Sequence, residues 1–319
     1  MDELDQEKTS FVTSQGLFCY KVKSFGLKST SASYQRLMNK MFVNQIRRNV
    51  QVYVDDMLVK SRREDDHLED LKETFDTLCS YNMKLNPSKC AFGVTAGKFL
   101  GFMLSQRGIE ANPDKIRAII EMAPPRNVKE VQSLNGKVAA LNKFVSRATD
   151  KCLPFCRTLK KSFEWTTECQ QVFEDLKAYL SSPPLLSPLK LGEELFLYLV
   201  VSPAVVSAAL IREENKVQKA VNYASWALRG AEERYPLMEK LTFALIIATR
   251  KLKPYFQAYT IVILTDKPLR RVMSSLEVAG RMALWAIELS EFDIQYHLCT
   301  AIKGHVVADF VVEFINLED

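Results

Sequence analysis

The clearest pattern in the chain is an alternation of apolar and polar residues on both sides of a short acidic centre. The alternating runs are Val50–Tyr53 and Met57–Lys60, and Asp55 and Asp56 lie between them. Alternation with a period of two residues is typical of a half-buried β-strand. The segment is therefore predicted to form a tight β-hairpin with two adjacent carboxylates at its tip.

The rest of the first hundred residues is predicted to be mixed α/β. A hairpin is expected over residues 11–22 with a turn at 14–16, followed by a helix over 31–46. A second helix is expected to open with a capping box at Ser61 and Glu64, and its apolar residues are Leu68, Leu71, Phe75 and Leu78. A hairpin-like element over 99–104 is expected to turn at 105–108.

Residues 105 to about 165 have the character of a small, basic, helical segment. Asn112 and Pro113 predict an N-cap with proline at the first helical position. After the break at Pro124-Pro125, Asn127 is predicted to cap a second helix that runs to about Phe144. Such a segment is expected of a connector or a thumb-like element.

The last part of the chain, from about residue 164, alternates between strand-like and helix-like runs. The predicted elements are a helix over 172–180, strands over 195–201, 205–212 and 219–225, a helix over 235–252, a strand over 260–264, a helix over 281–288, a strand over 292–297 and a helix over 305–314. After the first helix, the order β-β-β-α-β-α-β-α is the one expected of a ribonuclease H-like fold.

Composition narrows the functional classes. The 319 residues have 47% hydrophobic and 25% charged residues and a net charge of +5, which suits a globular protein of two or three domains and permits a nucleic-acid partner. Seven cysteines without C-x-x-C spacing predict reduced thiols, and no zinc pattern forms with the three histidines. The chain has no apolar run of bilayer length and no signal peptide. We therefore expect an intracellular protein, cytoplasmic or nuclear, without a membrane partner.

The two carboxylates at the predicted hairpin tip repel each other, so a fold that holds them there needs a compensating cation. A pair of divalent metal ions at a nucleotidyl-transfer site would supply it. The alternative is a solvated hairpin tip that happens to carry two acidic residues.

A series of ordered motifs resembles a known family. The first part of the chain resembles the palm of a gypsy-type LTR retrotransposon reverse transcriptase, of a lineage abundant in plant genomes, and the chain from Ala148 onward resembles the ribonuclease H portion of the same pol polyproteins. The matching strings begin at Gln15 (QGLFCY), Phe25 (FGLK), Tyr34 (YQRLM), Tyr53 (YVDD), Leu85 (LNPSKC), Phe99 (FLG) and Gly108 (GI).

The resemblance implies a role for each matching position of the palm. Asp55 and Asp56 match the carboxylates near the catalytic metals, and Tyr53 would pack beside the primer end. The remaining matches are Phe25 and Gly26 under the incoming nucleotide, Lys89 near the lysine that protonates pyrophosphate, and Phe99-Leu100-Gly101-Phe102 at the hairpin that grips the primer. The plainer interpretation makes Phe25 and Phe102 core residues and Lys89 a surface residue.

The palm departs from the family pattern at its beginning. A further aspartate, from the strand before the hairpin, bridges both metals in the family, and it lies upstream of the segment that matches Glu7–Thr9. The fingers also lie upstream. We therefore expect a truncated palm over residues 1–104 without polymerase activity, a helical thumb or connection over 105–163, and a ribonuclease H-like domain with a mixed five-stranded sheet over 164–319.

The ribonuclease H-like part shows a similar loss. By resemblance, Glu239, Asp266 and Asp309 match three of the four carboxylates that hold two Mg²⁺ ions, and Val200 occupies the position of the fourth. An apolar side chain cannot bind a metal, so the rate of hydrolysis is expected to fall by several orders of magnitude. The plainer interpretation is that Glu239 flanks a helix, Asp266 closes a turn and Asp309 lies on the surface.

The leading hypothesis is therefore a fragment of a retrotransposon reverse transcriptase with impaired catalysis. The resemblance implies Mg²⁺ as cofactor, with Mn²⁺ as a substitute, both bound weakly. The implied partners are an RNA–DNA hybrid or template–primer, a deoxynucleoside triphosphate, and other segments of the polyprotein. The alternative is a non-catalytic module for nucleic-acid binding or interaction, and a further one is a gene model in which Met1 lies inside a longer element.

Overall fold

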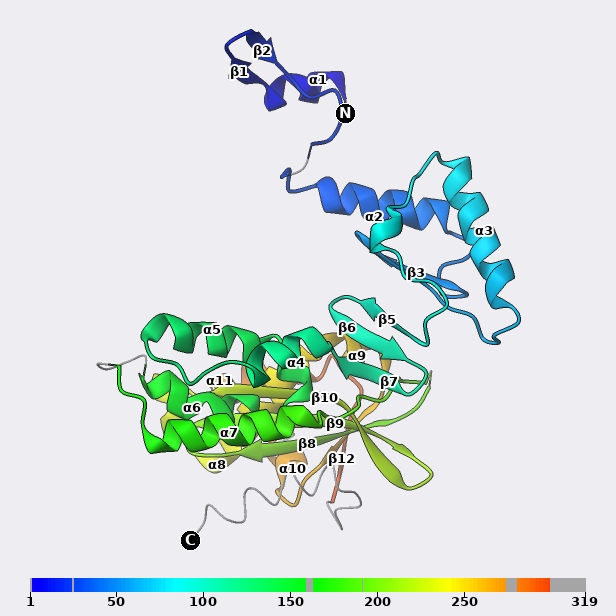
Figure 1. Ribbon diagram of the computed structural model, residues 1–319. Helices are drawn as coiled ribbons and strands as arrows, with labels where there is room; N and C mark the ends of the chain where they lie inside the picture. Colours follow the sequence, from blue (N-terminus) through cyan, green and yellow to red (C-terminus); the bar gives the residue numbers. More distant parts are fainter. Residues whose placement is uncertain (1, 25, 159–162, 191, 274–279, 299–319) are drawn as a thin grey trace. The chain divides into compact units, whose positions relative to one another are not determined.

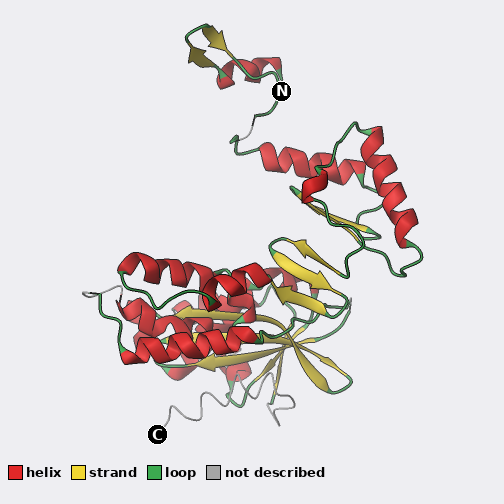
Figure 2. Ribbon diagram, viewed as in Figure 1, coloured by secondary structure: helices red, strands yellow, loops and turns green. Residues whose placement is uncertain are grey.

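A computed structural model describes residues 2–24, 26–158, 163–190, 192–273 and 280–298 (Figure 1). The chain divides into two compact units, Met1–Gly101 and Phe102–Asp319. Figure 2 shows that both units combine helices with strands, which confirms the predicted mixed α and β fold.

The first unit begins with a short helix and a small hairpin. Helix α1 covers Glu3–Gln6 and a 3₁₀ turn covers Glu7–Thr9. Strands β1 (Phe11–Thr13) and β2 (Gly16–Phe18) pair antiparallel, and all their residues are exposed. The predicted hairpin is thus confirmed, but its second strand ends at Phe18 rather than at Val22.

The core of the first unit lies between two helices and the acidic hairpin. Helix α2 covers Thr30–Met41, strands β3 (Val50–Tyr53) and β4 (Asp56–Val59) form the hairpin, and helix α3 covers His67–Ser80. The buried side chains are Met38, Met41, Phe42, Val50 and Leu78. Each buried side chain of this size contributes roughly 1.5–3 kcal/mol relative to exposure, so this small cluster fixes the hairpin against the helices.

Two predicted helix boundaries in this unit are wrong. Helix α2 ends at Met41 instead of Ile46, because the chain turns back so that Ile46 forms a bridge with Val50 and Arg47 adopts a positive φ of 70°. Ser61 is not a helix cap. Its hydroxyl donates to the Asp70 carboxylate at 2.5 Å and lies 3.0 Å from His67 Nδ1, and α3 begins only at His67.

The first unit ends with a 3₁₀ turn at Pro87–Lys89 and strand β5 (Ala96–Phe99). Leu100 and Gly101 follow with positive φ angles of 53° and 74°. The element predicted over residues 99–104 is therefore interrupted by a turn.

The second unit begins with an antiparallel pair, β6 (Phe102–Ser105) and β7 (Gly108–Ala111), followed by helices. The helical elements are α4 (Pro113–Ile120), α5 (Val128–Ala139), a 3₁₀ turn at Asn142–Phe144, α6 (Ala148–Thr158) and α7 (Thr167–Ser181). Asn112 and Asn127 are confirmed as caps, since each side chain accepts a hydrogen bond from a backbone N–H of its first turn. The helix after Asn127 ends at Ala139, earlier than predicted.

A mixed five-stranded sheet forms the centre of the second unit and confirms the predicted one. Its strands are β8 (Leu195–Val201), β9 (Val205–Glu214), β10 (Val217–Ala227), β11 (Ile261–Leu264) and β12 (Ile294–His297), in the order β10-β9-β8-β11-β12. Strand β8 is parallel to β11 and antiparallel to β9.

Helices follow and connect the later strands. They are a 3₁₀ turn at Gly230–Arg234, α8 (Leu237–Lys251), α9 (Lys253–Ala258), α10 (Leu269–Met273) and α11 (Arg281–Leu289). The helix predicted over residues 305–314 lies outside the described residues. No helix within the described part of the chain has the length and apolar character needed to cross a membrane.

Alternation along the sheet assigns its two faces to two cores. In β8, Leu195 and Leu197 pack with the cluster that includes α8 and α9, whereas Tyr198 packs with the cluster of helices α4–α7. In β9, Leu210 and Ile211 divide in the same way. The largely apolar runs that predicted these strands thus result from burial on both faces of the sheet.

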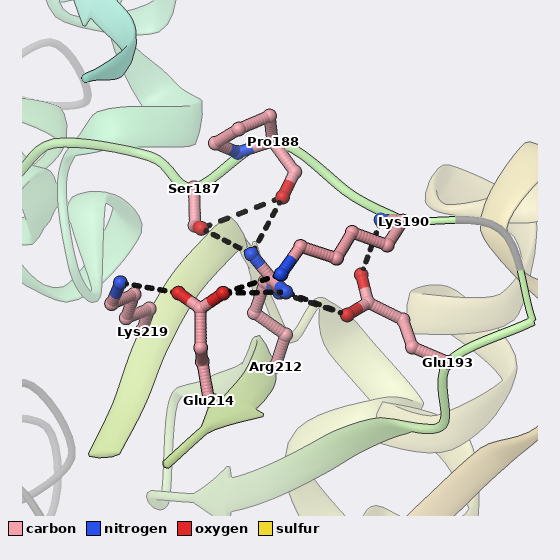
Figure 3. A network of polar contacts seen from close by, with 7 residues as sticks. All are labelled: Ser187, Pro188, Lys190, Glu193, Arg212, Glu214 and Lys219. Carbon is pink, nitrogen blue, oxygen red and sulfur yellow. Dashed lines mark hydrogen bonds and ion pairs between the residues drawn. The ribbon is translucent and has the colours of Figure 1, made fainter. Parts of the chain in front are cut away.

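A buried arginine fastens the segment before β8 to β9 (Figure 3). The Arg212 side chain is 4% exposed, and its guanidinium donates to Glu193 Oε2 at 2.9 Å, to the Ser187 hydroxyl at 3.2 Å and to the Pro188 carbonyl at 3.1 Å. Glu214 lies at 3.6 Å, and hydrogen bonds from Lys190 and Lys219 lower the pKa of its carboxyl to about 2. The arginine is therefore buried with its charge compensated.

Candidate nucleic acid and metal sites

The tip of the acidic hairpin is a two-residue turn that is held from a distant helix. Tyr53 pairs with Asp56, so Val54 and Asp55 form the turn, and Val54 has a φ of 48°. This conformation is unfavourable for a β-branched residue and costs on the order of 1–3 kcal/mol. Gln35, on α2, accepts a hydrogen bond from Val54 N at 2.6 Å and donates to Val52 O at 3.2 Å. One side chain therefore supports the strained turn.

The two carboxylates of the tip have different surroundings. Asp56 Oδ2 accepts a hydrogen bond from the backbone N–H of Leu100 at 3.0 Å, which joins the hairpin to the turn after β5. Asp55 is exposed and makes no hydrogen bond or ion pair with any residue that the structure describes. Burial, and then the charge of Asp55, raises the pKa of the Tyr34 hydroxyl. Asp55 is thus the carboxylate that is available to a ligand.

This pair matches the way in which proteins bind Mg²⁺ together with a substrate. Mg²⁺ is commonly held by one or two carboxylates and completed by waters and substrate phosphates. Asp55 offers one such carboxylate at an exposed tip, and Asp56 lies beside it. Within the described residues there is no group of three or more His, Cys, Asp or Glu side chains that could hold a metal ion.

The other predicted palm residues are spread over the unit. Tyr53 is 57% exposed beside the tip, Gly26 is exposed with a φ of 96°, and Phe25 lies outside the described residues. Lys89 is exposed at the end of its 3₁₀ turn, and Phe99 and Gly101 flank Leu100. Of these elements, the contact between Asp56 and Leu100 connects the acidic tip with the predicted primer-gripping turn.

In the second unit, the glutamate predicted to bind metal is paired with an arginine. Glu239 lies in the first turn of α8, and its Oε2 is 3.2 Å from Arg281 Nε at the start of α11. The pair is an ion pair without hydrogen-bond alignment, since Glu239 Oε2 is buried and has no hydrogen-bond partner among the described residues. The Arg281 guanidinium also lies 4.1 Å from the centre of the Tyr235 ring. The positively charged guanidinium of Arg281 therefore lies next to the Glu239 carboxylate.

The remaining ribonuclease H-like positions do not assemble into a metal site within the described residues. Asp266 follows β11, its side chain is 72% exposed, and its carboxylate pairs with Lys267 at 3.0 Å. Val200, in β8, packs against the apolar cluster of α4–α7 and faces Ser207 on β9. Asp309 lies outside the described residues. The side chains present here, one carboxylate paired with Arg281, one exposed carboxylate and a valine, do not fit a two-metal centre.

Sequence reasoning assigned no role to two residues that shape these sites. Gln35 was part of a matching string, but its hydrogen bonds reach Val52 and Val54, which are 17 and 19 residues away. Arg281 was predicted only as a helix start, although it pairs with a glutamate from another helix. Contacts this distant in sequence leave no periodic signal.

Comparison with known proteins identifies two family domains in the chain. Residues 1–104 match the family model of the reverse transcriptase (RNA-dependent DNA polymerase), and residues 165–263 match the RNase H-like domain found in reverse transcriptase. The chain thus combines reverse transcriptase sequence with an RNase H-like domain of reverse transcriptases, as predicted.

Relatives among curated proteins are polyproteins of transposons. The chain is 29% identical to the retrovirus-related Pol polyprotein from transposon 297 of Drosophila melanogaster, over 97% of the chain and 29% of that protein. It is 26% identical to the transposon Tf2-3 polyprotein of Schizosaccharomyces pombe, over 95% of the chain and 23% of that protein. The chain therefore spans about a quarter to a third of the length of these relatives.

Solved structures of foamy viral protease-reverse transcriptase share the fold. The form in complex with an RNA/DNA hybrid has a TM-score of 0.83 at 20% identity, over 95% of the chain and 42% of that protein. The form in complex with double-stranded DNA has a TM-score of 0.77 at 20% identity, over 95% of the chain and 65% of that protein. The predicted fold class is confirmed.

Proposed function

We propose that this chain is the palm, thumb-like and ribonuclease H-like part of a gypsy-type LTR retrotransposon reverse transcriptase of the plant-type lineage. In this proposal, residues 1–104 form the palm, 105–163 the helical connection and 164–319 the ribonuclease H-like domain. The ordered motif strings and the two family matches support it. The function is to hold a template–primer or RNA–DNA hybrid, in contact with other segments of the polyprotein.

The nucleic-acid partner is proposed from charge and from fold. The chain carries a net charge of +5, and the foamy viral reverse transcriptases that share its fold were solved with an RNA/DNA hybrid and with double-stranded DNA. Proteins bind such duplexes largely through backbone phosphates and helical shape. Binding by this chain is therefore proposed to be independent of sequence and sensitive to salt.

At the palm, we assign the metal-facing role to Asp55 and a positioning role to Asp56. Asp55 is exposed and unpaired among the described residues, whereas Asp56 holds the Leu100 amide. Asp55 would hold Mg²⁺ or Mn²⁺ weakly, as one carboxylate ligand beside the phosphates of a deoxynucleoside triphosphate. Phe25, Gly26, Tyr53 and Lys89, with the Phe99–Gly101 turn, keep the nucleotide- and primer-binding roles that the resemblance implies.

The ribonuclease H-like domain is proposed to bind the duplex without hydrolysing it. The observation that carries this proposal is the pairing of Glu239 with Arg281, together with Val200 at the position of a metal-bridging carboxylate. The hydroxyl of Ser207, directly across from Val200, is buried and lacks a hydrogen-bond partner among the described residues. A carboxylate at position 200 would offer this hydroxyl an acceptor, which supports the interpretation of Val200 as a replaced acid.

A binding assay tests the proposed function. The full chain is titrated into a fluorescein-labelled RNA–DNA hybrid, and anisotropy is measured between about 50 and 200 mM salt. The proposal predicts saturable binding whose affinity falls steeply with salt and is similar for duplexes of different sequence. The absence of binding at the low-salt end, or binding that is indifferent to salt, would refute it.

A further inference from the structure

Two lysines from different elements converge on one aromatic ring of the second unit. The ring is that of Phe102, the first residue of β6. The ammonium nitrogen of Lys143, in the 3₁₀ turn, lies 3.1 Å from the ring centre, and that of Lys115, in α4, lies 5.5 Å from it. Lys143 also lies 5.2 Å from the centre of the Phe144 ring. The Phe102 ring thus has two ammonium nitrogens within 5.5 Å of its centre.

These two charges lack the compensation that other lysines of the chain have. Lys190 and Lys219 pair with Glu214 at 2.6 Å, and Lys177 donates to the Met122 carbonyl. For Lys115 and Lys143, the described residues provide neither a carboxylate within ion-pair distance nor a hydrogen-bond acceptor. A cation over an aromatic face is stabilised by roughly 0.5–2 kcal/mol, which is less than a charged acceptor supplies when the site is dehydrated.

The pKa of Lys143 is affected by its burial and by the nearby charge of Lys115. Burial, and then the positive charge of Lys115, lowers the pKa of the Lys143 ammonium to about 8. An anion bound between the two nitrogens would reverse both effects, because it replaces lost solvation and screens the repulsion. A phosphodiester fits this requirement, since its two non-bridging oxygens can accept one hydrogen bond from each ammonium group.

We propose that Lys115 and Lys143 form a clamp for a single backbone phosphate of the bound nucleic acid, with Phe102 as the platform that fixes both ammonium groups. The inference rests on the proposed function and deepens it by naming a point of contact with the duplex. Phe102 directly follows the turn whose Leu100 amide binds Asp56. Because the proposed clamp contacts the phosphate and no base, it adds affinity without sequence preference.

A double-mutant cycle in the anisotropy assay tests the clamp. The variants are Lys115→Gln, Lys143→Gln and the double variant, and Lys216→Gln is the control because Lys216 is an exposed lysine of the same unit, in the turn between β9 and β10. Each single variant is expected to weaken binding by about tenfold near 0.1 M salt, and the control to leave it unchanged. Because one phosphate is shared, the double variant is expected to lower the salt slope by about one rather than two.

Outcomes of this experiment separate the two claims. Absence of binding by the unmodified chain refutes the proposed function. Binding by the unmodified chain with variants that behave like the Lys216 control, or with fully additive losses, overturns the clamp alone. Matching thermal unfolding midpoints of the variants show that the fold is intact.

A second measurement tests the clamp without reference to hybrid affinity. The lysines are reductively methylated with ¹³C, the Lys143 signal is assigned with the Lys143→Gln variant, and its pKa is followed by NMR. Addition of a short oligodeoxynucleotide is expected to raise this pKa, and the chemical shift of the Lys216 signal at fixed pH is expected to stay unchanged. An unchanged Lys143 pKa at saturating oligonucleotide would overturn the clamp.

Discussion

The support that Gln35 gives to the acidic hairpin leads to a specific prediction about its stability. The substitution Gln35→Leu removes the acceptor for Val54 N and the donor to Val52 O. Each such bond contributes a net ~1 kcal/mol, and the freed Val54 amide is left partly buried in a strained turn. We therefore expect the hairpin to be destabilised locally by about 2 kcal/mol, which corresponds to roughly a thirtyfold increase in opening.

Hydrogen–deuterium exchange of the full chain measures this opening directly. The amides of β3 and β4 are expected to exchange roughly thirtyfold faster in Gln35→Leu, while those of β8 and β9 in the second unit keep their rates. Gln51→Leu is the matched control, since Gln51 lies in β3 and its side chain makes no hydrogen bond with the described residues. In a Val54→Gly background the effect of Gln35→Leu should shrink, because glycine adopts a positive φ without strain.

Unchanged exchange in β3 and β4 after Gln35→Leu would refute this reasoning. So would an equal acceleration in Gln51→Leu, because the effect would then come from replacing any polar residue near the hairpin.

Three further predictions follow from charges in the second unit. Replacement of Arg212 by Met should lower the free energy of unfolding by about 3 kcal/mol, because it leaves the Glu193 carboxylate without its ion-pair partner. Urea unfolding followed by tryptophan fluorescence measures this loss. Hybrid affinity should fall as pH rises through about 8, where Lys143 loses its proton, and should stay level in Lys143→Gln. The double variant Val200→Asp with Arg281→Gln should bind Mn²⁺ more tightly than the unmodified chain, as detected by electron paramagnetic resonance, because it adds one carboxylate and releases Glu239.

Each of these predictions has a contradicting result. A loss below about 1 kcal/mol for Arg212→Met would place the arginine among ordinary surface ion pairs. The sign of the pH effect follows from linkage, since phosphate binding favours the protonated lysine; affinity that rises above pH 8 would contradict it. Equal Mn²⁺ binding before and after the double substitution would show that Arg281 and Val200 do not block a metal site.

Most of the helices and strands could be predicted from local sequence patterns. Strand β8 was predicted at its observed bounds because the apolar run from Leu195 to Val201 is unbroken, as suits a strand buried on both faces. Asn112 and Asn127 were predicted as caps because capping involves residues two or three positions apart. Ser61 and Glu64 had capping-box spacing, yet the Ser61 hydroxyl bonds to Asp70, nine residues away. Instead of accepting a backbone N–H as a cap does, Ser61 donates to a carboxylate in the first turn of α3, and the helix begins at His67, six residues after Ser61.

The candidate sites could be predicted only in part, because several of their contacts join residues that are far apart in the sequence. The acidic tip could be predicted from alternation, and the hairpin itself is confirmed. The glutamine that supports it and the arginine that pairs with Glu239 are set by contacts between distant segments. The role of Asp56 likewise depends on the Leu100 amide, 44 residues away. Such contacts are a product of tertiary packing and have no signature in spacing.

The central claim is that the ribonuclease H-like domain binds a hybrid and leaves its RNA strand intact. A single-turnover experiment tests it, with the full chain in excess over an RNA–DNA hybrid labelled on the RNA, in Mg²⁺ and then in Mn²⁺, and with Glu239→Gln as control. We predict that the bound RNA stays uncut in either metal. RNA cleavage that depends on the metal and disappears in Glu239→Gln would contradict the account.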